Sequence, residues 1–386
     1  MCIRDSNQTL LEYFLGEENS YVFIVKPNGI PELITIPITE EEDLNQLIDD
    51  FRESIYDNKN ESEQQQLAKK LYQKIFAPLE KIDLTDNIIL IPDGKLGSVP
   101  FDALISEDVY EKDASIPYYL GLKYTFSYNY SAALLKEMKD RHLVATKEGV
   151  LGFAPTFPKR GVAIAGNTYS RLPMNNKEVE NITDIFGGLS LINEQATKGA
   201  FLAKAPAYPY IHLSTHGVVN NNQPKFSFVS FAQNDQAVNQ DELLYVSDLF
   251  NTNLNAEMVT LSACETGIGK AYRGEGIISL ARGFAYAGTK SILPTLWSVN
   301  EQSTVKLMTR FYELLKTGKD KATALQMAKK ELILRDKLPP YYWAGTIAIG
   351  DMSPIVGDHK MLYGIVILLA MLVAYFFWKK TKKSMQ

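Results

Sequence analysis

The stretch YIHLSTHG (residues 210–217) is a short apolar run that ends on a histidine followed by a glycine. A second run, AEMVTLSACETG (residues 256–267), has the same form and carries Cys264 near its end. Such runs are typical of strands in a parallel sheet that is covered on both faces. Because ligands collect at the carboxyl ends of parallel strands, each run would place a reactive side chain where a substrate binds.

His216 and Cys264 suit each other chemically. A thiol has a pKa of about 8.5 and is mostly protonated at neutral pH. An imidazole, with an unperturbed pKa of about 6.5, can take the thiol proton and return it to a leaving amine. The amides of Gly217 and Cys264 are candidate donors to an oxyanion. The spacing of 48 residues leaves room for a crossover, and caspases also carry a histidine about 50 residues before a single cysteine.

Other interpretations of these residues stay open. Cys264 could be a small buried hydrophobic side chain, and a histidine at a strand end is often structural. His212 is expected in the core or behind the site. His212 and His216 share one side of a strand, but no further ligand cluster follows, so we predict no metal, and the chemistry needs no cofactor. The loop GIGKAYRGEG (267–276) lacks the Gly-Lys-Ser/Thr ending of a phosphate loop.

Helical and strand patterns alternate from about residue 20 to 350. We expect a hairpin at 21–38, followed by a helix with one apolar face. The apolar face of this helix is formed by Leu44, Leu47, Ile48, Phe51 and Ile55. Further strands are expected at 87–94, 149–155, 226–232 and 288–297, and further helices at 176–188, 274–287, 301–316 and 320–335. This alternation predicts an α/β fold with a mostly parallel sheet and helices on both faces.

The C-terminal segment MLYGIVILLAMLVAYFFW (361–378) contains 18 residues and no charge. As a helix it would span about 27 Å, close to the ~30 Å of a bilayer core, so we predict one transmembrane helix. A buried core helix is the alternative. The basic tail 379–386 is then cytoplasmic and the body lies outside the cytoplasm. A tail anchor with the body in the cytosol is the competing topology.

Charge and the N-terminus add two expectations. Residues 359–386 contain five lysines and no acids, which leaves 35 Lys and Arg against 45 Asp and Glu in the remainder. A body this acidic repels phosphate backbones, so we predict no nucleic-acid binding. The exported topology needs a signal that is not visible here, and MCIRDS (1–6) shows no structural pattern. We therefore expect the chain to be a fragment.

Several ordered motifs resemble the CHAT domain family of caspase-like and separase-like cysteine peptidases. They are LIPDGKLGSVPFDAL (90–104), LPMNNKEVENI (172–182), IHLSTHG (211–217), VTLSACETG (259–267), GEGIISLARGFAYAGTKSILPTLWSVNEQST (274–304) and YYWAGTIAIGD (341–351). The resemblance implies a caspase-like three-layer sandwich over residues 20–352. It also implies His216 as general base, Cys264 as nucleophile, and a tetratricopeptide-repeat region in cis that precedes the fragment.

These observations together predict a membrane-anchored cysteine endopeptidase that hydrolyses a protein or peptide substrate through an acyl-enzyme. A pocket for a basic substrate residue would need a carboxylate, and Asp93, Asp102 and Glu265 lie near motif ends. Two alternatives stay open: a non-catalytic or autoinhibited signalling or scaffold module with the same fold, and a thiol-dependent acyl transferase.

Overall fold

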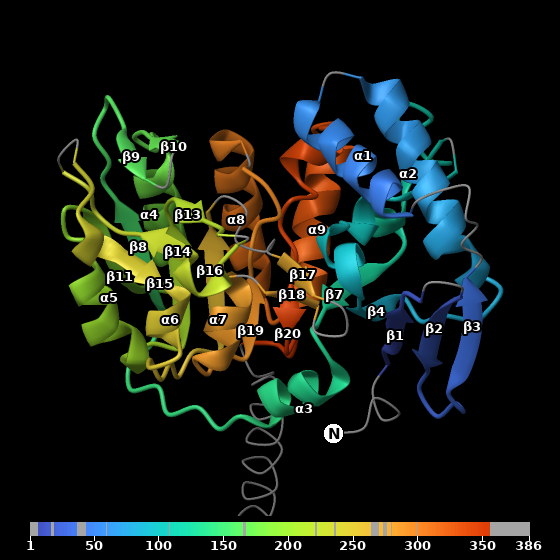
Figure 1. Cartoon of the computed structure of the whole chain (residues 1–386), viewed down its shortest axis with the longest axis horizontal. Helices are drawn as coiled ribbons and strands as arrows, with labels where there is room; N and C mark the ends of the chain where they lie inside the picture. The colour runs from blue at the N-terminus through green and yellow to red at the C-terminus, as the bar shows by residue number, and fades with distance from the viewer. Residues whose placement is uncertain are drawn as a thin grey trace, which may run out of the picture.

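The protein is described by a computed structural model (Figure 1). The described residues are 7–16, 19–36, 44–58, 60–107, 109–164, 167–220, 222–234, 237–263, 270–272, 276–278, 280–298 and 300–355. Cys264, Glu265, the segment 361–378 and the tail 379–386 lie outside them. Within the described residues, no helix combines the length and the apolar character that crossing a bilayer requires.

One large sheet organises the described part of the chain and crosses the whole width of the molecule (Figure 1). Its eleven strands follow the order β11 (Gly188–Asn193), β8 (Val150–Pro155), β12 (Tyr210–Ser214), β16 (Met258–Ser262), β19 (Ser291–Leu293), β20 (Ile349–Gly350), β7 (Thr125–Tyr128), β4 (Asn87–Ile91), β1 (Thr9–Phe14), β2 (Ser20–Val25) and β3 (Glu32–Ile36). Seven neighbouring pairs are parallel. Three are antiparallel. The sheet is therefore mixed but mostly parallel, as predicted.

Helices cover both faces of this sheet. They are α1 (Leu44–Asp57), α2 (Glu61–Ile75), α3 (Ala132–Asp140), α4 (Asn175–Phe186), α5 (Lys198–Lys204), α6 (Val246–Leu249), α7 (Leu280–Tyr286), α8 (Glu301–Lys316) and α9 (Lys321–Leu334). Short strands complete the fold at β5 (Ile105–Glu107), β6 (Tyr118–Tyr119), β9 (Val162–Ile164), β10 (Asn167–Tyr169), β13 (Gly217–Val218), β14 (Phe228–Ser230), β15 (Leu243–Tyr245), β17 (Lys270–Tyr272) and β18 (Gly276–Ile278).

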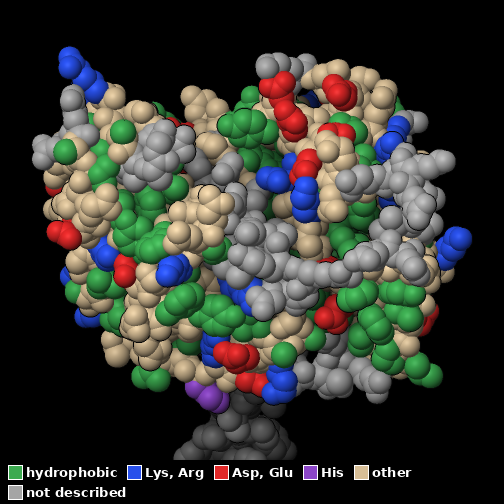
Figure 2. All heavy atoms as spheres, viewed as in Figure 1, with side chains coloured by type: hydrophobic (Ala, Val, Ile, Leu, Met, Phe, Trp, Pro, Cys, Tyr) green, Lys and Arg blue, Asp and Glu red, His purple; other side chains and the backbone are tan. Residues whose placement is uncertain are grey.

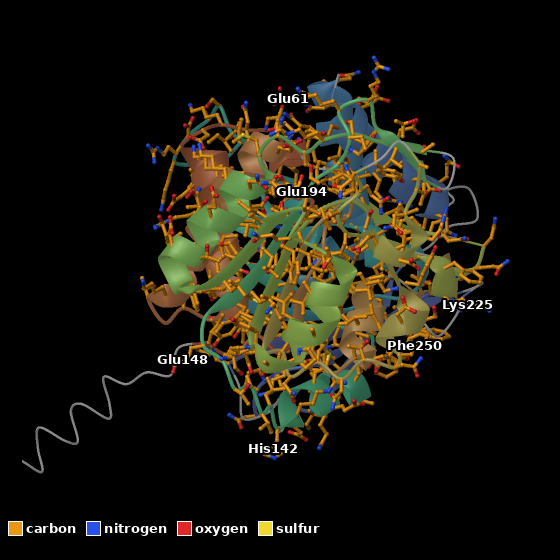
Figure 3. The ribbon with its side chains drawn as sticks, turned by 90° about the vertical axis from the view of Figure 1, so that its left-hand side faces the viewer. Glu61, His142, Glu148, Glu194, Lys225 and Phe250 are labelled. Carbon is orange, nitrogen blue, oxygen red and sulfur yellow. The ribbon has the colours of Figure 1, made fainter. Side chains whose placement is uncertain are left out.

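Neighbouring residues of β8 show how the layers are built. A Cβ atom on Gly152 would lie 2.5 Å from Cγ1 of Val179 on α4. The ring of Phe153 lies on the other face, with its centroid 5.7 Å from that of Phe201 on α5. Phe201 in turn contacts Phe284 on α7 at 6.4 Å. Because side chains alternate along a strand, α4 lies on one face while α5 and α7 lie on the other. Figure 3, which faces the β11 edge near Glu194, shows helices on both sides of the sheet.

The strands of the large sheet that precede residue 130 form the end of the sheet opposite β11. The hairpin predicted at 21–38 is present as the antiparallel pair β2 and β3. All five residues predicted to form the apolar face of α1 are buried. Apolar side chains also gather on the outer surface at this end of the sheet (Figure 2). They include Phe14, Phe23 and Leu33, which are exposed.

One predicted helix is shorter than expected. The pattern at 274–287 indicates a helix throughout, but residues Gly276–Ile278 form β18, which pairs with β17, and α7 begins at Leu280. A short apolar run is compatible with a helix or a strand, so the segment with which it pairs determines which of the two forms. The strands β1 and β7 were not predicted either, because each is recognisable only from its pairing with β4.

We expect Gly152→Ala to destabilise the fold by about 1–3 kcal/mol, because the added methyl would overlap the buried Val179 side chain. Urea denaturation would measure the loss. Gly199→Ala is the matched control: Gly199 is an exposed residue of α5 whose added Cβ would meet only Thr197 Oγ1 at 3.9 Å. Its expected effect is neutral or stabilising by about 0.5–1 kcal/mol. Equal losses in both variants would contradict the close approach of α4 to β8.

Candidate functional site

The two strand ends identified in the sequence lie next to each other. β12 pairs in parallel with β16, with Ser214 opposite Ser262, and the amide of Thr215 donates to the carbonyl of Ser262 at 3.2 Å. In the sequence, His216 follows Ser214 by two residues and Cys264 follows Ser262 by two. After β16 the structure describes the chain as far as Ala263, and Cys264 is the next residue in the sequence. The paired strands therefore direct both segments toward the same edge of the sheet.

His216 is held in an aromatic environment with one ring nitrogen engaged. Its side chain is 8% exposed, and its ring lies 4.5 Å from that of Phe157 and 5.0 Å from that of Tyr169. The Nε2 atom lies 2.8 Å from the carbonyl oxygen of Ser170. Because a carbonyl only accepts hydrogen bonds, we assign the proton to Nε2, and the neutral ring then has its lone pair on Nδ1.

The Nδ1 atom of His216 is buried and has no hydrogen-bond partner among the residues that the structure describes. Burial lowers the pKa of the His216 imidazole, and the hydrogen bond to Ser170 opposes this effect. A buried nitrogen that carries a lone pair and lacks a donor is unusual in a protein interior. The ring is therefore prepared to accept a proton through Nδ1.

A cavity of ≈ 120 Å³ opens beside His216. This is well above the ~10–15 Å³ that one water molecule requires. It lies between the ends of β12 and β16 and the first turns of α4 and α8. Its lining is formed by Leu172, Met174, Asn175, Glu178, Ser214, Thr215, His216, Ser262, Ala263, Ser298, Glu301 and Thr304. Two carboxylates are present, and none of these described lining residues is a lysine or an arginine.

Glu178 lies at the buried end of a polar network. Its Oε1 is 3.0 Å from Nε2 of His212, and its Oε2 accepts a hydrogen bond from Ser214 Oγ at 2.9 Å. On the other side of the His212 ring, Nδ1 lies 3.3 Å from the hydroxyl of Tyr312, which is 3.1 Å from Thr260 Oγ1. His212 is fully buried, so it lies in the core behind the cavity, as the sequence suggested.

Gly217 has a backbone geometry compatible with the predicted oxyanion contact. The amide of Ser230 donates to the carbonyl of His216 at 2.9 Å, and Gly217 is paired with Val229 in the antiparallel ladder. In such a ladder hydrogen-bonded and non-hydrogen-bonded pairs alternate, so the pair of Gly217 and Val229 is the non-bonded one. The ladder between β13 and β14 therefore does not use the Gly217 amide.

Two of the three carboxylates chosen from the sequence, Asp93 and Asp102, are not brought to this cavity. Asp93 follows β4, five strands away from β12, or roughly 24 Å at ~4.8 Å per strand. Its Oδ2 accepts a hydrogen bond from the amide of Leu15 at 2.9 Å. Asp102 is buried and forms an ion pair with Lys329 of α9. Glu265, like Cys264, lies outside the described residues.

Glu178 and Glu301 were not singled out by the sequence analysis. Glu178 lies within the motif at 172–182, and Glu301 within the motif at 274–304, so the motifs contained both residues without revealing their role. Their proximity depends on the packing of α4 against α8, where the Met174 amide donates to Glu301 Oε2 at 2.8 Å. Among the described residues, no group of three or more His, Cys, Asp or Glu side chains is arranged to hold a metal.

Comparisons with known proteins agree with this architecture. The CHAT domain matches residues 65–351. Tetratricopeptide repeat protein 28 of Mus musculus is 23% identical over 333 residues, and that of Homo sapiens is 23% identical over 334 residues. Each alignment covers 73% of this chain but only 13% of the relative. The structure of the Saccharomyces cerevisiae separase–securin complex superposes with a TM-score of 0.57 at 10% identity, covering 90% of this chain and 30% of that one. This similarity concerns the fold.

We expect His216 to titrate below the ordinary histidine pKa of about 6.5, because its ring is buried. The change Phe157→Ala should raise the pKa toward that value by admitting water to the ring. The pH dependence of the His216 ring signals in NMR would measure both, in Cys264→Ala protein so that no thiol titrates with the ring. A pKa at or above 6.5 in the protein with Phe157 intact would contradict the burial argument.

Proposed function

Because the chain belongs to the CHAT domain family, we propose that it is a cysteine endopeptidase in which His216 and Cys264 form the catalytic dyad. The family match covers residues 65–351, and the fold resembles that of separase. The observation that carries the proposal is the state of His216: its Nδ1 is buried, bears the lone pair and has no partner among the described residues. A general base in a thiol peptidase requires such a nitrogen.

The proposed reaction uses each of these groups in turn. Nδ1 of His216 takes the proton of the Cys264 thiol, and the thiolate attacks the carbonyl carbon of the scissile peptide bond. The amides of Gly217 and Cys264 donate to the resulting oxyanion. The His216 imidazolium, stabilised by the Ser170 carbonyl, then protonates the leaving amine. Nδ1 finally takes a proton from water, which attacks the thioester and releases the acid.

Two features of the whole protein remain part of the proposal. We propose that a tetratricopeptide-repeat region acts in cis, because the curated relatives are tetratricopeptide repeat proteins and the matched region is 13% of their length.

We also propose that 361–378 anchors the protein with the basic tail in the cytoplasm and the body outside. Protease added to intact cells should then digest the body, whereas protection of the body would contradict this topology.

The dyad predicts the effect of single substitutions on peptide hydrolysis. We expect Cys264→Ala to abolish hydrolysis and labelling by an electrophilic thiol probe, and His216→Ala to lower kcat/KM by about 10²–10⁴-fold. The protein with the intact dyad and each variant would carry Cys2→Ser, because Cys2 is the other cysteine of the chain and would also react with the probe. His142→Ala is the matched control, since His142 is an exposed residue that lies at the periphery in Figure 3.

Three outcomes separate the possible functions. Loss of activity in both dyad variants but not in His142→Ala supports the peptidase. Absence of labelling and cleavage in the full-length protein under every activating condition would favour a scaffold with the same fold. Acyl exchange without peptide hydrolysis would favour a transferase.

A further inference from the structure

We propose that the cavity beside His216 is a selectivity pocket that binds the basic side chain, arginine or lysine, of the substrate residue on the amino side of the scissile bond, with Glu301 as the carboxylate that pairs with the cation. This inference deepens the proposed peptidase function and rests on it. Four features of the cavity carry the argument: its position, its charge, its walls and the restraint of its carboxylates.

The position of the cavity connects it to the proposed reacting centre. Its wall includes His216, which is 8% exposed and whose buried Nδ1 has no hydrogen-bond partner among the described residues. It also includes Ala263, the residue that precedes Cys264 in the sequence. A side chain that enters this cavity therefore belongs to a substrate residue next to the attacked carbonyl.

The described lining of the cavity carries acidic side chains and no Lys or Arg. Glu178 and Glu301 both line it, and the described lining contains no lysine or arginine to neutralise them. The pKa of Glu301 is raised, first by burial and also by the charge of Glu178, while the hydrogen bond from the Met174 amide opposes the shift. A cationic side chain would remove the repulsion between the two carboxylates and replace part of their lost hydration.

The walls of the cavity suit a long side chain with an apolar stem. Leu172, Met174 and Ala263 supply apolar surface, against which the methylene groups of arginine or lysine can pack. The polar residues Ser262, Ser298 and Thr304 also line the cavity. A shorter acidic side chain would find two carboxylates and no described cation, so its binding is disfavoured.

The two carboxylates are restrained to different degrees. Both oxygens of Glu178 are engaged, by His212 and by Ser214, so its position is set by the core. Glu301 is only partly buried and lies at the start of α8, where its Oε2 is held by the Met174 amide. Glu301 is therefore the carboxylate that can adjust to form a charge-assisted hydrogen bond with a guanidinium or ammonium group.

A panel of peptides that differ only at this substrate position tests the pocket. We expect the protein to cleave the arginine peptide with a kcat/KM at least about 10–100-fold above that of the citrulline peptide, which is a neutral isostere. Glu301→Gln should lower the arginine value by roughly 10–100-fold and leave the citrulline value within about twofold. Glutamine can keep the hydrogen bond from Met174, so this variant should fold. Asp93→Asn is the matched control, and it should leave the arginine preference unchanged.

A binding measurement separates the pocket from the peptidase activity. Calorimetry would compare acetyl-arginine amide with acetyl-citrulline amide on the Cys264→Ala protein and on its Glu301→Gln derivative. Selective binding of the arginine amide that is lost in Glu301→Gln would support the pocket even if no peptide were hydrolysed, and the peptidase proposal alone would then fall. Cleavage without a basic preference, or with a preference that Glu301→Gln does not change, would overturn the pocket and leave the peptidase standing. Absence of both selective binding and selective cleavage would also overturn it.

Discussion

The parallel pairing of β12 with β16 is the contact on which the candidate site depends. His212 lies opposite Thr260 in this pairing, and the hydroxyl of Tyr312 on α8 contacts both side chains, at 3.3 Å and 3.1 Å. A slip of one residue would turn one of the two side chains to the other face of the sheet. Tyr312 therefore supports this register, and the register determines which residues of the two strand ends lie side by side at the carboxyl edge.

The opposite edge of the sheet shows how the fold treats polar groups that only support the structure. Lys321 is fully buried, but its ammonium group contacts Glu257 Oε1 at 2.9 Å and the carbonyl of Asp351 at 3.0 Å. Breaking such a buried pair typically costs about 3–5 kcal/mol. At the carboxyl edge, in contrast, Nδ1 of His216 is buried without a partner among the described residues. A buried polar atom next to a cavity that has no partner in the described part of the chain is the physical reason to place function there.

The network behind the cavity links the core to the site. Glu178 on α4 joins His212 and Ser214 of β12, and Asn175 Nδ2 donates to the carbonyl of Pro155 at the end of β8 at 2.9 Å. A buried carboxylate is tolerated here because its oxygens are hydrogen-bonded. The same contacts orient α4, whose N-cap residue Met174 provides the amide that holds Glu301. Glu178 thus contributes both to the packing of α4 on β12 and to the charge of the cavity lining.

The elements with a clear hydrophobic period, and the residues that follow the strand ends, could be predicted from the sequence. The apolar face of α1, the bounds of α8 and the apolar runs of β12 and β16 were all predictable, because burial on one or both faces leaves a local pattern of apolar residues. The helix start at Leu280 and the placement of Glu178 and Glu301, 123 residues apart in the sequence, on one cavity were decided by tertiary packing. No local pattern records that these two residues line one cavity, since this arises from the packing of α4 on α8 and from the strand pairing beneath them.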